Sequence, residues 1–167
     1  DEDARHSNGG TVSDELLTEL MSHPFVSQPP PKSTGRDEFG VNLVDEIKSR
    51  FPLPPSDLLR SLVRFTGRSI AANIRQSVEF QDEVDTLIVS GGGVHHPLVM
   101  SDLQAELPGM QVVTSQELGI DPDLKEALLM AVLAVAHVEG VPGNMPGVTG
   151  AREEVVLGQL APAQGAS

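Results

Sequence analysis

The clearest chemical signature in the chain is three consecutive glycines, Gly91, Gly92 and Gly93, which end a short apolar run. Glycine permits positive φ angles and lets a ligand lie directly on the main chain. A strand that ends in glycine and leads into a helix places bare backbone at the carboxyl edge of an α/β sheet, where ligands bind. The pattern indicates nucleotide binding, and a tight strand-to-helix turn that needs glycine for its own geometry explains it equally well.

The spacing of these glycines matches neither the phosphate loop that ends in Lys-Ser/Thr nor the dinucleotide pattern Gly-x-Gly-x-x-Gly. The glycines therefore need not touch phosphates, and they could equally form the floor under an adenosine.

Polar side chains that could contact a substrate occur in three other segments. Lys32, Ser33 and Arg36 follow three prolines, and an exposed surface loop is the simpler interpretation of this cluster. Glu126 begins a long apolar run, where a carboxylate could bind sugar hydroxyls or simply suit the positive end of a helix. Asn144 stands in "PGNMP", where it is a second candidate for substrate contact or a turn former.

The histidines offer a further possible chemistry, a metal site. They are His6, His23, His95, His96 and His137. Metal sites in helices or hairpins use ligands at spacings such as i and i+4, whereas the side chains of adjacent residues usually diverge. We therefore expect no metal site, and a metal hydrolase using His95 and His96 is the weakest hypothesis.

Composition limits the class of function. The chain has 167 residues, about one domain, with 11 basic and 24 acidic residues and a net charge of −13. This charge argues against binding to nucleic acid or to anionic membranes. Cysteine is absent, which excludes disulfides and thiol nucleophiles. We find no membrane-span pattern and no signal peptide, so a cytoplasmic location is expected. The first residue is Asp1 and not Met, which either processing or trimming of the N-terminus or a longer protein cut upstream would explain.

Hydrophobic periodicity predicts the elements that must position these residues. The expected helices are 11–22, 42–51, 57–78, 97–107 and 121–139. The expected strands are 84–90 and 110–115. This alternation is an α/β pattern with few strands flanked by several helices. Two strands seldom form a self-sufficient sheet, so the chain is expected to borrow strands from another part of the protein.

Local signals refine these helices. Spacing of three and four residues places Leu16, Leu17, Leu20 and Met21 on one face of the first helix. It also predicts an apolar stripe on the third helix, made of Leu58, Leu59, Leu62, Val63, Ile70, Ile74 and Val78. Thr11 or Ser13 is expected to cap the first one, and Ser56 the third. Gly67 leaves room for a neighbouring element to pack closely. Residues 127–138 are nearly all apolar, which predicts a helix buried on most sides.

Four segments in order carry a family resemblance: "PPPKSTGRDEF", "LIVSGGGVHHPLVM", "LGIDPDLKEALLMAVLA" and "GVPGNMPGVTGA". Together they closely resemble the C-terminal half of the anhydro-N-acetylmuramic acid kinase family, over nearly the whole chain. The resemblance implies the C-terminal lobe of an actin-like, sugar-kinase (ribonuclease H-like) fold, expected over residues 1–155 with a tail at 156–167. It also implies ATP and Mg²⁺ as cofactors, and hydrolysis and phosphorylation of a 1,6-anhydro muramic sugar to N-acetylmuramic acid 6-phosphate in cell-wall recycling.

The resemblance assigns the glycines and His96 to ATP, although the family usually has Asn at the position of His96. It assigns Lys32, Ser33, Arg36, Glu126 and Asn144 to the substrate. Near the first of these segments, Asp37 and Gly40 depart from the family pattern, which usually reads Glu-x-Phe-Asn from position 37 to position 40.

Two family motifs are missing, the phosphate loop and the stretch that carries the catalytic aspartate; both belong upstream of Asp1. Phosphoryl transfer needs in-line positioning, a base and neutralised charge. The chain is therefore expected to be inactive alone and to need an N-terminal kinase lobe, with a homodimer as the assembled form. The alternative is a degenerate, non-catalytic lobe kept for dimerisation or regulation.

Overall fold

Helices make up most of the structure, a computed structural model that describes residues 1–76 and 84–161. The α-helices are α1 (Asp14–Met21), α2 (Pro24–Ser27), α3 (Val41–Arg50), α4 (Pro55–Gln76), α5 (Pro97–Glu106), α6 (Lys125–Val138) and α7 (Pro146–Thr149). The strands are β1 (Thr86–Val89) and β2 (Gln111–Thr114). The 3-10 turns are η1 (Glu2–Ala4), η3 (Gly92–His95), η4 (Ser115–Leu118) and η5 (Pro122–Leu124).

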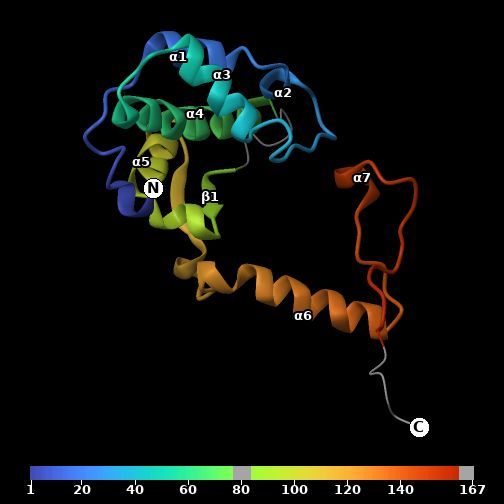
Figure 1. Cartoon of the computed structure of the whole chain (residues 1–167). Coiled ribbons are helices and arrows are strands. Elements are labelled where there is room, and N and C mark those ends of the chain that lie inside the picture. Colours follow the sequence, from blue (N-terminus) through green and yellow to red (C-terminus); the bar gives the residue numbers. More distant parts are fainter. Residues whose placement is uncertain (77–83, 162–167) are drawn as a thin grey trace.

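The elements lie in successive levels, as Figure 1 shows. Helices α1 to α4 form the upper level, α5 and the strands lie beneath α4, and α6 lies at the bottom. This arrangement confirms an α/β domain with few strands flanked by several helices.

The start of α1 shows how the sequence sets the upper level. The hydroxyl of Ser13 accepts a hydrogen bond from the amide of Leu16 at 3.3 Å, which confirms one of the two predicted caps. The Ser13 amide in turn donates to the Ser61 hydroxyl on α4, at 2.9 Å. Leu16 and Leu20 are buried on the face that the periodicity predicted.

A small apolar core joins α1, α3 and α4. Its buried residues are Leu16, Leu20 and Ile47, and partly buried side chains packed against them are Leu43, Phe51, Leu53, Leu58, Leu62 and Phe65. This cluster therefore belongs to the helical level, and Leu103, Leu107 and Val113 are buried separately around α5 and β2.

Helix α4 meets α5 through small residues. A Cβ atom at Gly67 would lie 2.9 Å from the Asp102 Cβ, so the two helices approach too closely for a larger residue without movement. This confirms the close packing predicted at Gly67. The predicted stripe of large apolar residues on α4 is only partly right, because Ile70 is 39% exposed whereas Gly67 and Ala71 are buried. Val78, placed in the same stripe, lies outside the described residues.

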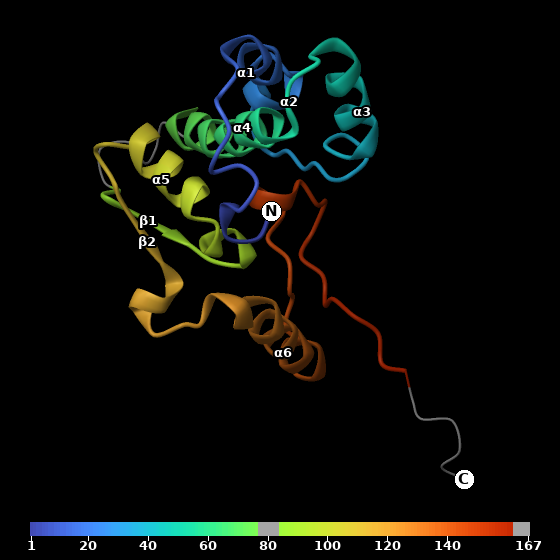
Figure 2. The same ribbon diagram turned by 60° about the vertical axis from the view of Figure 1, so that its left-hand side comes forward.

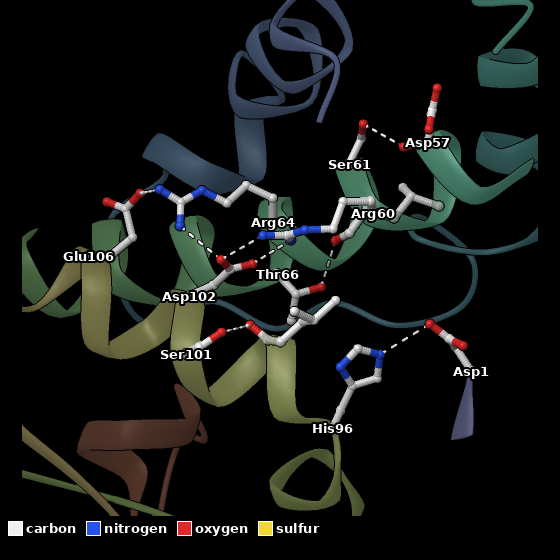
Figure 3. A network of polar contacts seen from close by, with 12 residues as sticks. Asp1, Asp57, Arg60, Ser61, Arg64, Thr66, His96, Ser101, Asp102 and Glu106 are labelled. Carbon is white, nitrogen blue, oxygen red and sulfur yellow. Dashed lines mark hydrogen bonds and ion pairs between the residues drawn. The ribbon is translucent and has the colours of Figure 1, made fainter. Parts of the chain in front are cut away.

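A buried ion-pair network crosses the same contact, as Figure 3 shows. Arg60 donates to both carboxylate oxygens of Asp102, at 2.7 and 3.0 Å. Arg64 bridges Asp102 at 3.0 Å and Glu106 at 2.8 Å. The Asp102 side chain is only 6% exposed, so each of its oxygens depends on these arginines for compensation.

The sheet is parallel and contains only β1 and β2 in the described part of the chain. Thr86 lies opposite Gln111 and Val89 opposite Thr114, and α5 connects the two strands. Because the strands are parallel, the segment that follows β1 and the segment that follows β2 both begin at the carboxyl ends of the strands.

Several predicted boundaries need correction. The predicted cap at Ser56 is wrong: α4 begins at Pro55, and the Ser56 hydroxyl lies inside its first turn against the Asp57 carboxylate. The short helices α2 and α7 were not predicted, because four residues carry too little periodicity to signal a helix. The long C-terminal helix begins at Lys125 after a separate 3-10 turn, and not at residue 121.

The prediction that residues 127–138 are buried is also wrong for this chain. In α6, which the structure describes throughout, no side chain is buried, and Val132 and Val135 are 55% and 63% exposed. Figures 1 and 2 both show α6 apart from the helical level. The C-terminal loop contacts its last turns, where the His137 ring lies 2.9 Å from the Leu157 carbonyl and Leu133 lies against Gly143. Among the described residues, no helix combines the length and the apolar character needed to cross a membrane.

The ion-pair network generates a stability prediction. Asp102→Ala leaves Arg60 without its buried partner and Arg64 with Glu106 alone, so it should lower the free energy of unfolding by about 3 kcal/mol. Glu46→Gln, which removes an exposed partner of Arg50, is the control and should cost less than about 1 kcal/mol. Urea unfolding followed by circular dichroism measures both, and equal costs for the two variants would contradict the role assigned to the network.

Candidate functional site

The glycine loop follows β1 and is tied to the segment that follows β2. The Gly91 amide donates to the Pro122 carbonyl at 3.1 Å. Gly91 has φ 86° and ψ 178°, a conformation that residues with a Cβ atom rarely adopt. The turn itself therefore requires glycine at this position.

Gly92 and Gly93 differ from Gly91. Neither has a φ angle in the left-handed region, and a Cβ atom built on either would meet no described atom within 4 Å. They open the 3-10 turn η3, which leads through His95 and His96 into α5. Neither the backbone geometry nor the described packing explains why side chains are absent here.

A cavity of about 600 Å³ lies beside this loop. It is lined by Asp1, Glu2, Asp3, Gly92, Gly93, His95, His96 and Val99. One wall is therefore bare main chain with two imidazoles, and the opposite wall carries carboxylates from the N-terminal segment. No sequence signal indicates that second wall, because residues 1–3 and 92–96 meet only through tertiary structure.

His96 faces the protein more than the cavity. Its side chain is 14% exposed, and its Nε2 atom lies 3.3 Å from the Asp1 carboxylate (Figure 3). Its Nδ1 atom is buried with no hydrogen-bond partner among the described residues. The ring therefore links the start of α5 to the N-terminal segment, and one ring nitrogen keeps its hydrogen-bonding capacity.

His95 is exposed and pairs with the segment after β2. Its Nε2 atom lies 2.8 Å from the Asp123 carboxylate in η5. The hydrogen bond to Asp123 raises the pKa of His95 above the ordinary value of 6.5, and the charges of Asp123, Asp121 and Asp3 act in the same direction. This pair is the second tie, after Gly91–Pro122, between the glycine loop and η5.

Glu126 is the predicted substrate residue that lies at the glycine loop. A Cβ atom at Gly91 would lie 3.9 Å from the Glu126 carboxylate and 3.5 Å from the Lys125 ammonium group. The Glu126 side chain is 68% exposed, and its carboxylate lies 3.5 Å from the Lys125 Nζ atom. The Glu126 carboxylate is thus exposed next to the loop, where a ligand can reach it.

Lys32 lies elsewhere, at a second cavity of about 730 Å³ whose walls include Phe25, Phe39 and Phe65. Its ammonium group donates to the Phe25 carbonyl at 2.8 Å and lies over the Phe25 ring. Ser33 and Arg36, in the same loop, are exposed. Among the described residues, no hydrogen bond or ion pair joins this loop to the glycine loop.

Both the NH₂ group and the oxygen of the Asn144 side chain form hydrogen bonds within the C-terminal loop. Its NH₂ group donates to the Glu153 carbonyl at 2.9 Å, and its oxygen accepts from the Val155 amide at 2.7 Å. The alternative of a turn-forming residue describes these contacts better than direct ligand binding. The same loop reaches the Lys32 segment, because a Cβ atom at Gly150 would lie 3.4 Å from Pro31.

Comparison with known proteins gives one consistent result. The sequence profile of the family described as anhydro-N-acetylmuramic acid kinase matches residues 1–163. A curated relative called anhydro-N-acetylmuramic acid kinase, from Mannheimia succiniciproducens, is 41% identical over 168 residues, a match covering 97% of this chain and 44% of the relative. One of the same name from Salinibacter ruber is 40% identical over 164 residues, covering 96% of this chain and 41% of the relative.

Fold and matches together define the class: the chain is an α/β lobe of the sugar-kinase type, with few strands and flanking helices. Within that class, the chain belongs to the anhydro-N-acetylmuramic acid kinase family. It spans less than half the length of the curated relatives that it matches.

The contact between His95 and Asp123 generates a pH prediction. A raised pKa in the folded protein means that the protonated ring is favoured there, so its stabilising contribution is complete below pH 6.5 and is lost as the pH rises through the raised pKa. A nuclear magnetic resonance titration of the His95 ring should show this raised pKa, and Asp123→Asn should lower it. Asp121→Asn is the matched control with a smaller effect, and an unchanged His95 pKa in Asp123→Asn would refute the pairing.

Proposed function

We propose that the chain supplies the adenosine-binding part of an ATP-dependent kinase that acts on 1,6-anhydro-N-acetylmuramic acid. One observation carries this proposal: Gly92 and Gly93 border a cavity, and nothing in the described structure requires them to lack side chains. Bare main chain at the end of a sheet strand suits a flat adenine that lies directly on the backbone.

The cavity fits a nucleoside better than it fits phosphates. Asp1, Glu2 and Asp3 would repel a triphosphate, whereas carboxylates accept hydrogen bonds from ribose hydroxyls. The described residues hold no group of three metal-ligating side chains, so they do not by themselves form a site for Mg²⁺. We therefore place the phosphates and their Mg²⁺ toward the part of the longer proteins that this chain does not match.

The substrate residues divide into two roles in this proposal. Glu126 is exposed beside the glycine loop and contacts sugar hydroxyls directly. Lys32 and Asn144 act as positioning residues, because both are already bonded to main-chain atoms. Ser33 and Arg36 are exposed, and in this proposal they also contact the sugar once the second lobe is present.

The reaction itself is proposed for the whole protein. Bound ATP supplies the phosphoryl group, and this chain's residues orient the nucleoside and one side of the sugar. None of the proposed contacts provides a catalytic base for the acceptor hydroxyl, so we propose that the chain is inactive without an N-terminal kinase lobe. A cytoplasmic location and a homodimeric assembly complete the proposal.

The glycine loop offers a test that separates binding from folding. Gly92→Ala should change the free energy of unfolding by less than about 0.5 kcal/mol, since the new methyl group meets open space. In the complete kinase it should weaken MgATP binding at least tenfold, a loss of about 1.4 kcal/mol, because the methyl group would project toward the adenine. Isothermal titration calorimetry and urea unfolding provide the two measurements.

Gly91→Ala is the matched control, and it should destabilise the fold by about 1–3 kcal/mol because its φ angle disfavours a Cβ atom. Unchanged MgATP affinity in Gly92→Ala would reject the proposal that the adenosine lies on the main chain of Gly92 and Gly93. It would favour the second candidate, a non-catalytic lobe that self-associates without binding a nucleotide.

A second test addresses the sugar. Glu126→Gln in the complete kinase should raise the KM for the anhydro sugar about tenfold with little change in the KM for ATP, because a charge-assisted hydrogen bond to a hydroxyl is lost. Glu139→Gln, at the other end of α6, is the control and should leave both constants unchanged. Equal KM values in Glu126→Gln and the unmodified enzyme would remove Glu126 from the sugar site.

A further inference from the structure

Helix α6 and the sheet share one unusual property: apolar surface that this chain leaves uncovered. The most exposed large side chains of α6 are Leu128, Leu129, Met130, Val132, Val135 and Val138, each at least 50% exposed. On β1, Ile88 is 48% exposed although it sits in the middle of the strand. A helix that is apolar on all sides is normally buried on all sides, so this surface requires a partner.

The two edges of the sheet differ. On β2, the outward-facing Val112 amide donates to the Gln104 side chain at 3.1 Å, and the Gln104 NH₂ group donates to the Met110 carbonyl at 2.9 Å. Gln104 lies on α5, so this helix covers part of the outer edge of β2. On β1, the side of the strand that faces away from β2 is its outer edge. Among the described residues, none forms a hydrogen bond with the main-chain groups on that side.

The register shows which groups of β1 face outward. The Gln111 amide donates to the Asp85 carbonyl at 2.7 Å, so the main-chain groups of Asp85 point toward β2. Main-chain groups alternate along a parallel strand, and therefore those of Leu87 and Val89 also point toward β2. The N–H and C=O groups of Thr86 and Ile88 face away from β2 and are available to another strand.

We infer that the outer edge of β1 and the apolar sides of α6 form one docking surface, and that its occupant is a strand-forming apolar segment from the rest of the longer protein. That segment adds at least one strand beside Thr86 and Ile88, and α6 then packs on the enlarged sheet. The matched relatives provide the necessary length, because this chain corresponds to only 44% and 41% of them.

Charge and geometry favour this occupant over a second copy of the chain. Two copies would each bring a net charge of −13 to the contact, which opposes association. An edge of four residues is also short for a stable interface between two copies. The homodimer proposed above would therefore use another face.

The test needs no nucleotide, so its outcome is independent of the proposed adenosine site. The part of the Mannheimia succiniciproducens relative that this chain does not match is produced separately and mixed with the chain. We expect a 1:1 complex in analytical ultracentrifugation. Hydrogen exchange should show the amides of Thr86 and Ile88 protected at least 100-fold more than in the chain alone, with the Val112 amide little changed.

Val132→Asp on α6 should weaken the complex at least tenfold without lowering the thermal midpoint of the chain alone, because the side chain contacts solvent there. Val41→Asp, at a position 73% exposed at the start of α3, is the matched control and should leave the complex intact. A covalent fusion of the same segment ahead of Asp1 provides a second measurement of amide protection, which is independent of association.

The inference is overturned by any of three results. The first is the absence of protection at Thr86 and Ile88 in both the mixture and the fusion. The second is a complex that Val132→Asp and Val41→Asp weaken equally. The third is self-association of the chain alone that protects these same amides, which would make a second copy the occupant.

Discussion

The arrangement of this lobe depends on the ion-pair network buried between α4 and α5. Arg60 and Arg64 reach Asp102 across a contact that Gly67 makes close, so the spacing and the rotation of α5 relative to α4 are both fixed. The glycine loop leads directly into α5, and its position is therefore set by the charges of Asp102 and Glu106 further along that helix. Without these arginines, the carboxylate of Asp102 would be buried without compensation, and α5 would lose its register.

The same logic explains why the candidate site has walls of different chemistry. One wall is the main chain of Gly92 and Gly93. Two interactions with η5 fix its position: the hydrogen bond from the Gly91 amide to the Pro122 carbonyl and the contact between His95 and Asp123. The other wall is the acidic N-terminal segment, held by Asp1 against His96. Each wall thus has its own polar anchor, and both anchors lie at the ends of short segments instead of inside a rigid sheet.

Much of the fold follows from local sequence signals. The period of Leu16 and Leu20 predicts the buried face of α1, and the run that ends at Gly91 predicts β1, because these signals depend on near neighbours only. The exposure of α6 was not predictable. An apolar composition predicts burial, and we infer that the segment that buries α6 lies outside this chain. In the site, the turn geometry of Gly91 and the open space at Gly92 could be separated only with coordinates, and the involvement of Asp1 arises from tertiary contact alone.

The side-chain amide of Gln104 at the outer edge of β2 has a wider consequence for solubility. A short parallel sheet whose two outer edges are both open could add strands on both sides and build fibrils from repeated copies. The Gln104 side chain, on α5, occupies part of the outer edge of β2, so it disfavours the addition of a strand there. Growth is then restricted to a single direction and stops once one complementary segment has been accepted. The outer edge of β1 is then the one that such a segment closes.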